Sequence, residues 1–413
     1  MADSWASRAE VDHLVDQLTE AAGSYSDGAT LEGQASRAEL SARAKALSRA
    51  VASPELTPHH HGLNMAELIA IRTFMRLGVL DAIPSPGSIS LQQLSEATGV
   101  QSSLLERMAR ILVPVISSLP CTPTIPPLFF PLPPQSHAPN RLLTVALRYD
   151  EWFRAMCNFD EYLVENGQLQ HAKEPDDPLR NPYTSFYKQP GTPVWSIMSQ
   201  DPERFQTFQT GMAGIDLAIP IVGHFDFDLL RNTPEEASQN RIALVDVGGG
   251  HGAVLQKILS TYPALAPAAC VLQDLPDVIA LSRKSNVLPS DVQRQEHDFT
   301  QEQPIRGAKA YFMRMILHDY ADVHGILILS RLAAAMAPDS RVLVCEMVLP
   351  PRVNEATFPA AVLDQAVMTM GGKERTEDGF RDMFDKAGLD LVKVWRVPGV
   401  PGACVEGRLR PSA

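Results

Sequence analysis

The stretch LVDVGGGHGAVLQKIL, residues 244–259, constrains the fold of this chain more than any other feature. It runs from an apolar strand into a turn with four glycines and then into an amphipathic helix. Glycines let a ligand approach the backbone closely, and the first N–H groups of a helix point at whatever lies above the turn. The stretch therefore predicts a strand, turn and helix that bind a ligand.

Two nucleotide-binding patterns fit this turn equally well. Gly248, Gly250 and Ala253 satisfy G-x-G-x-x-G/A, which is typical of dinucleotide-binding loops. Asp246 and Gly252, taken with the same two glycines, satisfy D-x-G-x-G-x-G, the loop of S-adenosylmethionine (SAM) methyltransferases. The turn alone does not distinguish these ligands from each other or from a tight turn without a ligand.

Strand-like and helical segments alternate from about residue 225 onward. Five strand-like segments are each followed by turn residues or a helical run: RIALVDV, ACVLQDL, VQRQEHD, AKAYFMRMIL and SRVLVCEMVL. This alternation predicts a doubly wound, Rossmann-like α/β domain with a parallel sheet over residues 225–413. In such a sheet, ligands bind at the carboxyl ends of the strands.

Residues 1–224 are expected to form a second, mainly helical domain. Apolar stripes at helical spacing include Leu14, Leu18 and Ala21, and then Ala66, Ile69, Phe74 and Leu77. The segment SISLQQLSEATGVQSSLLERMARIL, residues 88–112, predicts a helix-turn-helix with Gly99 in the turn. Its charges sum to zero, which favours a structural module over a DNA-reading one.

The stretch between Ile111 and Asn140 has nine prolines and no charged residue. Proline removes backbone donors, which excludes a membrane-spanning segment despite the apolar composition. A winged helix would place a hairpin with alternating polar residues here, and none is recognisable. We expect an irregular, proline-rich insert over residues 111–144, either genuine or a translated intron.

The composition excludes several classes of partner. The formal net charge of −12 argues against a nucleic-acid-binding surface. The five cysteines are scattered with no C-x-x-C pair, which predicts reduced thiols in the cytoplasm and neither a disulfide framework nor a metal site. The start of the chain, MADSWASRAEVDHLVDQLTEAA, lacks the apolar core of a secretory signal. We expect a cytoplasmic protein that binds no membrane, nucleic acid or metal.

Polar residues fall where the strands are expected to end. Asp274 lies roughly 20 residues past the glycine turn, as does an acid that binds a ribose hydroxyl. Asp298 and Phe299 follow the third strand and are either contacts of an adenine ring or a surface cap beside a core aromatic. Arg314 interrupts the apolar fourth strand. These positions would share one edge of the sheet.

One histidine and two further acids complete this edge. His318, followed by Asp319, ends the fourth strand. Glu346 stands between apolar neighbours in the fifth strand, where an ionised carboxylate is costly unless it is paired. Glu374 lies in the glycine-flanked loop GGKERTEDGF. A general base with orienting acids requires this combination of residues.

The motifs VDVGGGHG, LQDLP, HDF, LHDY, CEMVLP and GGKERT, in this order and spacing, resemble the small-molecule O-methyltransferases of plant caffeate type and their fungal counterparts in secondary metabolism. The resemblance covers residues 145–413, and the SLLERM segment resembles the family's winged-helix-like dimerisation domain. It implies SAM as the cofactor, a homodimer, metal-independent methyl transfer, and a small aromatic acceptor with a phenolic hydroxyl, such as a polyketide.

The resemblance also implies a role for each site residue. His318 resembles the catalytic base and Glu346 and Glu374 the acids that flank it, while Met212 and Asp319 resemble contacts of the acceptor. The implied cofactor contacts are Gly248, Gly250, Gly252, Asp274, Leu275, Asp298, Phe299, Arg314 and Phe208. Arg314 stands where the family usually has lysine, which keeps the charge and changes its shape. Residues 111–144 depart from the family altogether.

Two other functions remain open from the residues alone. A nicotinamide-dependent oxidoreductase would use the same glycine turn. It lacks a second catalytic group of residues outside the histidine and its two glutamates, and it leaves Asp246 unexplained. A winged-helix DNA-binding regulator lacks the positive charge it needs. Apolar stripes over residues 69–80 and 104–112 further predict that the N-terminal helices pair two copies of the chain.

Overall fold

The computed structural model describes residues 6–28, 30–51, 68, 71–75, 77–84, 89–105, 124–125, 148–168, 173–212, 219–285, 287–353, 357–397 and 400–410. The chain divides into two compact units. Described residues within Met1–Gln17, Ala46–Arg154 and Met198–Gly214 belong to the first, and those within Leu18–Lys45, Ala155–Ile197 and Ile215–Ala413 to the second. These units do not meet at a single boundary after residue 224. The described residues within 18–45 and 155–197 of the region expected to form the helical domain belong to the unit that contains the sheet.

The first unit contains the start of the expected helix-turn-helix. Helix α4 (Leu91–Thr98) begins with a capping box between Ser90 and Gln93 and ends at Gly99, whose φ is +69°. Residues 102–105 begin the next helix. Five apolar residues are buried together here: Ile71, Phe74, Val79, Leu94 and Leu105. Ala66 and Ile69 of the expected stripe lie outside the described residues.

One strand of a short β-ladder lies within the segment expected to be irregular. Strand β2 (Thr124–Ile125) pairs antiparallel with β1 (Ile89–Ser90). The sequence did not predict this pair because two residues cannot display an alternating pattern. The rest of residues 111–144 lies outside the described residues.

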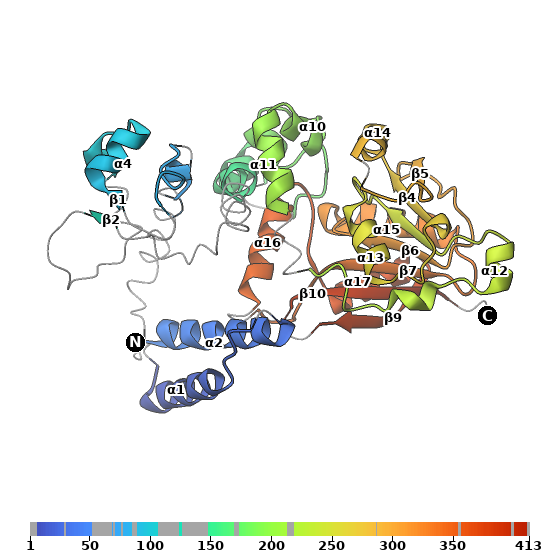
Figure 1. Ribbon diagram of the computed structural model, residues 1–413, viewed down its shortest axis with the longest axis horizontal. Coiled ribbons are helices and arrows are strands. Elements are labelled where there is room, and N and C mark those ends of the chain that lie inside the picture. The colour runs from blue at the N-terminus through green and yellow to red at the C-terminus, as the bar shows by residue number, and fades with distance from the viewer. Residues whose placement is uncertain are drawn as a thin grey trace. The chain divides into compact units, whose positions relative to one another are not determined.

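Among the described residues, eight strands of the second unit form one sheet (Figure 1). The order is β5-β4-β3-β6-β7-β10-β9, and β8 pairs with β7 off this path. The five expected strands are present and parallel: β3 (Leu244–Val247), β4 (Cys270–Asp274), β5 (Gln293–Glu296), β6 (Ala310–Arg314) and β7 (Arg341–Leu349). The chain builds outward from β3 to β5 and returns to β6 on the other side of β3. The switch point therefore lies where the glycine turn begins.

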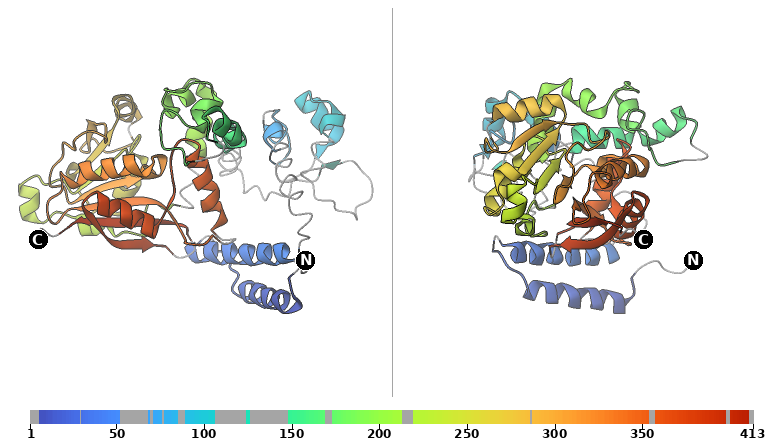
Figure 2. Two further views of the ribbon diagram at one scale, coloured as in Figure 1. Left: turned by 180° about the vertical axis from the view of Figure 1, so that it is seen from behind. Right: turned by 90° about the vertical axis from the view of Figure 1, so that its right-hand side faces the viewer.

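Helices cover both faces of this sheet (Figures 1 and 2). Leu244 packs in a core with residues of α13 (Ala253–Thr261) and α14 (Pro276–Ser285). Its neighbours Val245 and Val247 pack in the opposite core with residues of α15 (Asp322–Ala333) and α17 (Glu377–Lys386). Alternate side chains of a strand face opposite sides, so a strand buried on both sides reads as a continuous apolar run. This confirms the doubly wound α/β class.

The last two strands differ from the expected parallel sheet. β10 (Gly402–Leu409) pairs antiparallel with both β7 and β9 (Leu389–Arg396). A short connection joins β9 to β10 without a crossover helix, and strands joined in this way pair antiparallel. The sheet is therefore mixed, and its parallel part carries the glycine turn.

The remaining described elements are mainly helical: α1 (Arg8–Gly23), α2 (Leu31–Ala50), η1 (Arg148–Phe153), α7 (Arg154–Cys157), α8 (Phe159–Glu165), α9 (Pro182–Phe186), α10 (Val194–Ser199), α11 (Pro202–Met212), η3 (Phe227–Leu230), α12 (Pro234–Ser238), η4 (Pro267–Ala269), η5 (Leu317–Asp319), α16 (Phe358–Met368) and β8 (Arg375–Thr376). No helix in the described ranges is long and apolar enough to cross a membrane.

Candidate active site

The glycines between β3 and α13 have different structural reasons. Gly248 and Gly252 have φ angles of +71° and +91°, and a Cβ on either would lie within 2.7 Å of Ile316 or Leu288 side-chain atoms. Gly250 also has a positive φ, of +62°, but a Cβ there would meet nothing within 4 Å. Packing therefore explains the first two glycines. Gly250 faces open space, which is where a ligand of this turn would lie.

Asp274, at the end of β4, is tied to the glycine turn. Its Oδ2 accepts the Gly250 N–H at 2.8 Å, and its Oδ1 accepts the Leu275 N–H at 2.7 Å. Burial raises the pKa of Asp274, although these two backbone N–H groups oppose the shift. Each oxygen keeps acceptor capacity, as binding two ribose hydroxyls requires. The side chain of Leu275 is 51% exposed.

Asp298 and Phe299 show features of both sequence interpretations. Asp298 is exposed, and its Oδ1 accepts the Thr300 N–H at 2.9 Å and the Thr300 hydroxyl at 2.7 Å. It thus caps its own turn. Phe299 is half-buried, and its Cε1 lies 3.4 Å from the position a Gly248 Cβ would take. The ring therefore borders the glycine turn.

Asp246 and Arg314 lie beneath this turn. Asp246 is 1% exposed, and its Oδ2 has no hydrogen-bond partner among the described residues. Burial raises the pKa of Asp246 to about 7. Arg314 ends β6, and its Nη2 donates to the Ile219 carbonyl at 2.5 Å. Its charge favours ionisation of Asp246, while its hydrogen bond fixes the chain segment that precedes the sheet.

His318 lies in the single turn η5 after β6 and is 4% exposed. Its Nδ1 lies 2.7 Å from Oε1 of Glu374, which is 2% exposed. Its Nε2 lies 3.5 Å from Oδ1 of Asp319. A carboxylate on Nδ1 fixes the tautomer and leaves Nε2 as the nitrogen that exchanges a proton.

Glu346 contacts the backbone of this turn. Its Oε1 accepts three N–H groups, from Ile316 at 3.1 Å, Leu317 at 2.6 Å and His318 at 3.2 Å. The structure thus separates the two acids: Glu374 contacts the imidazole, and Glu346 holds the backbone that carries it.

The acids around His318 set its protonation. Burial lowers its pKa, but the carboxylates of Asp319, Glu374 and Glu346 outweigh burial and raise the pKa to about 10. Burial in turn raises the pKa of Asp319 to about 6 and that of Glu346 to about 7. These acids therefore stabilise the imidazolium form of His318, and the groups titrate as one system.

Several residues that fix the His318 turn were missed by sequence reasoning. Arg375 is 2% exposed and donates to the carbonyls of Leu317 and Tyr320 at 3.0 and 2.8 Å. The Lys373 N–H donates to the His318 carbonyl at 2.8 Å. A Cβ on Gly372 would lie 2.2 Å from that carbonyl oxygen. All three belong to the GGKERT motif, which the sequence analysis did identify. Its charged residues suggested exposure to solvent rather than burial.

Phe208 and Met212 belong to α11 of the first unit. Phe208 is half-buried and meets Trp152 edge to face, with ring centroids 6.1 Å apart. The other implied site residues belong to the second unit, and Gly250, Asp274, His318, Glu346 and Glu374 are each connected by contacts to the carboxyl edge of its sheet.

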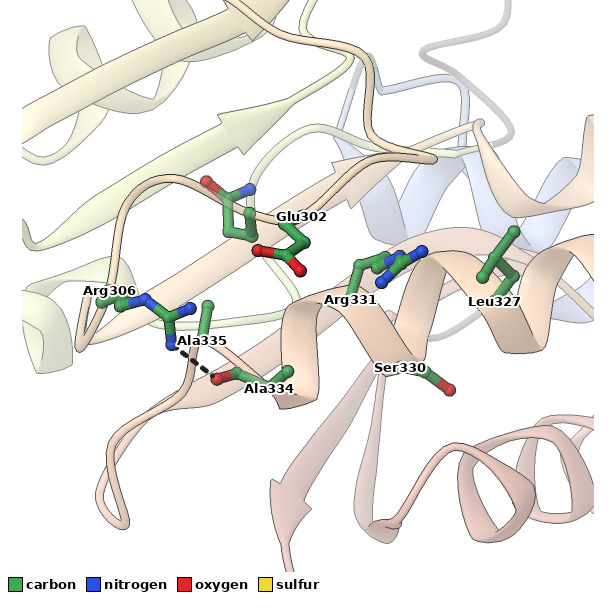
Figure 3. Close-up of a pocket in the computed structure, with 8 residues that line it drawn as sticks. Glu302, Arg306, Leu327, Ser330, Arg331, Ala334 and Ala335 are labelled. Carbon is green, nitrogen blue, oxygen red and sulfur yellow. Dashed lines mark hydrogen bonds between the residues drawn. The ribbon is translucent and has the colours of Figure 1, made fainter.

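Two hollows lie away from this edge. One, of about 300 Å³, is lined by Glu302, Arg306, Leu327, Ser330, Arg331 and their neighbours (Figure 3). The other, of about 420 Å³, is lined by residues of α8 and α9 and of the loops beside these helices. Neither contains the histidine or the glycine turn, so the chemistry of the residues identifies the site here. Over the described ranges, no group of three or more His, Cys, Asp or Glu residues could hold a metal ion.

Comparisons with known proteins identify the family. A family model described as an O-methyltransferase domain matches residues 173–390. Methyltransferase fsa4 of a Fusarium species is 30% identical over 344 residues, which cover 82% of this chain and 92% of that protein. O-methyltransferase kntB of Aspergillus niger is 31% identical over 354 residues, which cover 84% and 81%.

Solved structures of similar proteins agree. The crystal structure of OxaC in complex with SAH and oxaline has a TM-score of 0.76 and 25% identity, and covers 98% of this chain and all of OxaC. The mitomycin 7-O-methyltransferase MmcR has a TM-score of 0.67 and 25% identity, and covers 90% and 99%. The chain therefore belongs to the O-methyltransferase family and, as its sequence predicts, is a SAM-dependent O-methyltransferase.

Proposed function

We propose that this enzyme methylates a phenolic hydroxyl of a small aromatic secondary metabolite, such as a polyketide, and that His318 is the base. The contact between His318 Nδ1 and Glu374 Oε1, at 2.7 Å in a buried setting, is the observation that carries the proposal. It fixes the imidazole so that Nε2 remains to take a proton. OxaC has been crystallised with oxaline and with meleagrin, so a relative of similar fold takes small-molecule ligands.

The proposed cofactor contacts follow the edge of the sheet. Gly250 would lie against the cofactor, Asp274 would bind its ribose hydroxyls, and Asp298 and Phe299 would contact its adenine. Gly248 and Gly252 shape the turn, and Leu275 contributes its backbone. Arg314 supports this edge through its hydrogen bond to the Ile219 carbonyl and through its charge, which favours ionisation of Asp246 beneath the turn. We assign Phe208 to the cofactor and Met212 and Asp319 to the acceptor, as the resemblance implies.

Removal of the acceptor's proton is the step that the chain's own residues perform. A phenol of pKa about 10 is roughly 0.1% ionised at pH 7, so its phenolate costs about 4 kcal/mol. The three carboxylates raise the pKa of His318 and so stabilise the imidazolium that forms when the neutral ring takes the acceptor's proton. The imidazolium in turn stabilises the phenolate by charge.

When bound, the cofactor would supply an activated methyl group on a sulfonium for transfer to the acceptor oxygen. His318 would hold the acceptor's proton until solvent removes it. Glu374 stabilises that imidazolium through Nδ1. No metal is needed in this scheme because the proton acceptor and its counter-charges are side chains of the enzyme.

The proposal extends to assembly and location. We propose a homodimer formed through a winged-helix-like N-terminal domain, and a cytoplasmic enzyme. The family match does not favour the nicotinamide-dependent oxidoreductase or the DNA-binding regulator.

The test is a panel of small aromatics that carry a phenol, an aliphatic alcohol, an amine or a carboxylate, incubated with SAM and analysed by mass spectrometry. We expect a mass gain of one methylene on phenols, unchanged turnover with a metal chelator, and loss of turnover in His318→Ala. Methylation confined to amines or carboxylates, or a requirement for metal, would contradict the proposal.

A further inference from the structure

We infer that Arg375 is a positioning residue of the reaction, which acts together with Glu346 on the turn that carries His318. Glu346 binds the N–H groups of this turn and Arg375 binds its carbonyl groups, so the turn is held between two buried side chains of opposite charge. The inference rests on the proposed role of His318 as the base. It assigns to Arg375 an effect on proton removal that is exerted through His318.

The N–H side of the turn is occupied by Glu346. One carboxylate oxygen from β7 accepts the N–H groups of three consecutive residues, Ile316, Leu317 and His318, at 2.6–3.2 Å. Glu346 is fully buried. Hydrogen bonds to a charged group contribute more than neutral ones, and an isolated buried carboxylate is costly. Three donors on one oxygen therefore hold the turn close to β7.

The carbonyl side is occupied by Arg375 from β8. Its Nη1 donates to the carbonyls of Leu317 and Lys373, each at 3.0 Å, and its Nη2 to that of Tyr320 at 2.8 Å. Its Nε donates to Asp322 Oδ1 at 2.8 Å. The side chain is 1% exposed. The planar guanidinium thus connects both ends of the turn to the start of α15, which a lysine cannot do.

The two clamping strands are fixed relative to each other. β7 and β8 are parallel, with Val348 opposite Arg375 in the ladder. The same segment supplies Glu374, the residue before Arg375, to the His318 imidazole. One short piece of chain therefore places both the orienting acid and the backbone clamp, and a shift of Arg375 would move His318 relative to Glu374.

The turn needs such a clamp because its backbone is not in a relaxed conformation. Met315, which enters the turn, has a φ of +56°, in the left-handed region that favours glycine. A residue other than glycine held there costs on the order of 1 kcal/mol and persists only where the surroundings determine it. Glu346 and Arg375 are those surroundings, so weakening either should let His318 leave its working position.

The test compares Arg375→Lys with wild type at a series of pH values, using a phenolic acceptor. Lysine keeps the positive charge and loses the fork. A misplacement of about 1 Å can lower turnover by roughly 10²-fold, so we expect a loss of about 10- to 100-fold at pH 7. SAM affinity should be unchanged, because Gly250 and Asp274 lie on other strands. Arg381→Lys, an exposed arginine of α17 paired with Glu377, is the matched control and should behave as wild type.

The pH series distinguishes positioning from general damage. Asp319, Glu346, Glu374 and Arg375 are the charged groups that face His318 from its own turn and from the strands against it, and Asp364 of α16 accepts the Glu374 N–H. Lysine preserves the charge of this set. If Arg375 acts through His318, the deficit should shrink toward wild type as pH approaches the acceptor's own pKa, where the base is no longer needed. A deficit constant with pH would overturn the inference.

A double mutant separates this inference from the proposed function. In His318→Ala, Arg375→Lys should cause little further loss, since both changes act on one step. If His318→Ala itself shows no pH-dependent deficit, the proposed base fails. If it does and the two losses multiply, the clamp fails. Asp322→Asn weakens the outer anchor of Arg375, together with the longer ion pair between Asp322 and Lys373. It should show a smaller deficit with the same pH dependence, and it provides the same test if Arg375→Lys does not fold.

Discussion

Substitution of Gly250 by alanine tests whether the open space above the glycine turn holds the cofactor. Gly250 has a φ of +62°, and its new Cβ would meet no protein atom within 4 Å. The left-handed conformation costs an alanine about 1–2 kcal/mol. Stability should therefore fall by that amount and no more, because nothing clashes.

The effect on the cofactor should be larger than the effect on the fold. If SAM lies against Gly250, the added methyl group occupies its space, and we expect SAM affinity to fall by at least about tenfold, or 1.4 kcal/mol. Gly388→Ala is the matched control. Gly388 has a φ of +82° and equally open surroundings, but it lies between α17 and β9. It should lose similar stability and keep its SAM affinity.

Thermal unfolding with and without SAM, together with calorimetric titration, measures both quantities. A ligand that binds the folded state raises the unfolding temperature according to its concentration over Kd, so the two variants should differ in this rise. Equal SAM affinity in Gly250→Ala and Gly388→Ala would refute the reasoning, because it would show that the cofactor does not lie against Gly250. Gly252→Ala, whose Cβ would lie 2.3 Å from Leu288 Cδ1, should lose more stability than either.

Three further predictions follow from the site and the N-terminal helices. Glu374→Gln should lower turnover less than His318→Ala, because glutamine keeps an acceptor for Nδ1 and loses only the charge that stabilises imidazolium; equal losses in steady-state kinetics would contradict this. The raised pKa of His318 stabilises the fold fully below about pH 6.5 and loses that effect as pH rises toward about 10, so denaturant titrations should show a shallower loss over this window in His318→Gln. If the free energy of unfolding falls equally with pH in wild type and His318→Gln, this prediction is wrong. Sedimentation at micromolar concentration should show a dimer, and a monomer would count against assembly through the N-terminal helices.

The sequence predicted the parallel half of the sheet because four of its five strands, β3, β4, β6 and β7, are buried and mostly apolar. Val245 and Val247 pack on one face and Leu244 on the other, so β3 reads as an unbroken apolar run ending in glycine. Two-residue β1 and β2 have no such signal. The antiparallel pairing of β10 depends on which edge of β7 is free, a tertiary choice that neither strand's own sequence records.

The sequence predicted which residues form the candidate site better than it predicted the contacts between them. A histidine and two acids at strand ends indicated a base with orienting groups, and the structure brings His318, Glu346 and Glu374 together. That Glu374 meets the imidazole while Glu346 accepts backbone N–H groups depends on atoms a few ångströms apart. Arg375 was missed because arginine is rarely buried unless paired, and three of its four partners lie 53–58 residues away in the chain.

The measurement that tests the central claim most directly is the pH dependence of turnover in His318→Ala and wild type with a phenolic acceptor. At pH 7 the variant should be slower by roughly 10²–10⁴-fold with nearly unchanged SAM affinity. Turnover of the variant should rise more steeply with pH than that of the wild type, because only the variant depends on solvent to ionise the acceptor. The gap should close as pH nears the acceptor's pKa. A variant that methylates at near wild-type rate at pH 7, or a gap of the same size at every pH, would contradict the assignment of His318 as the base.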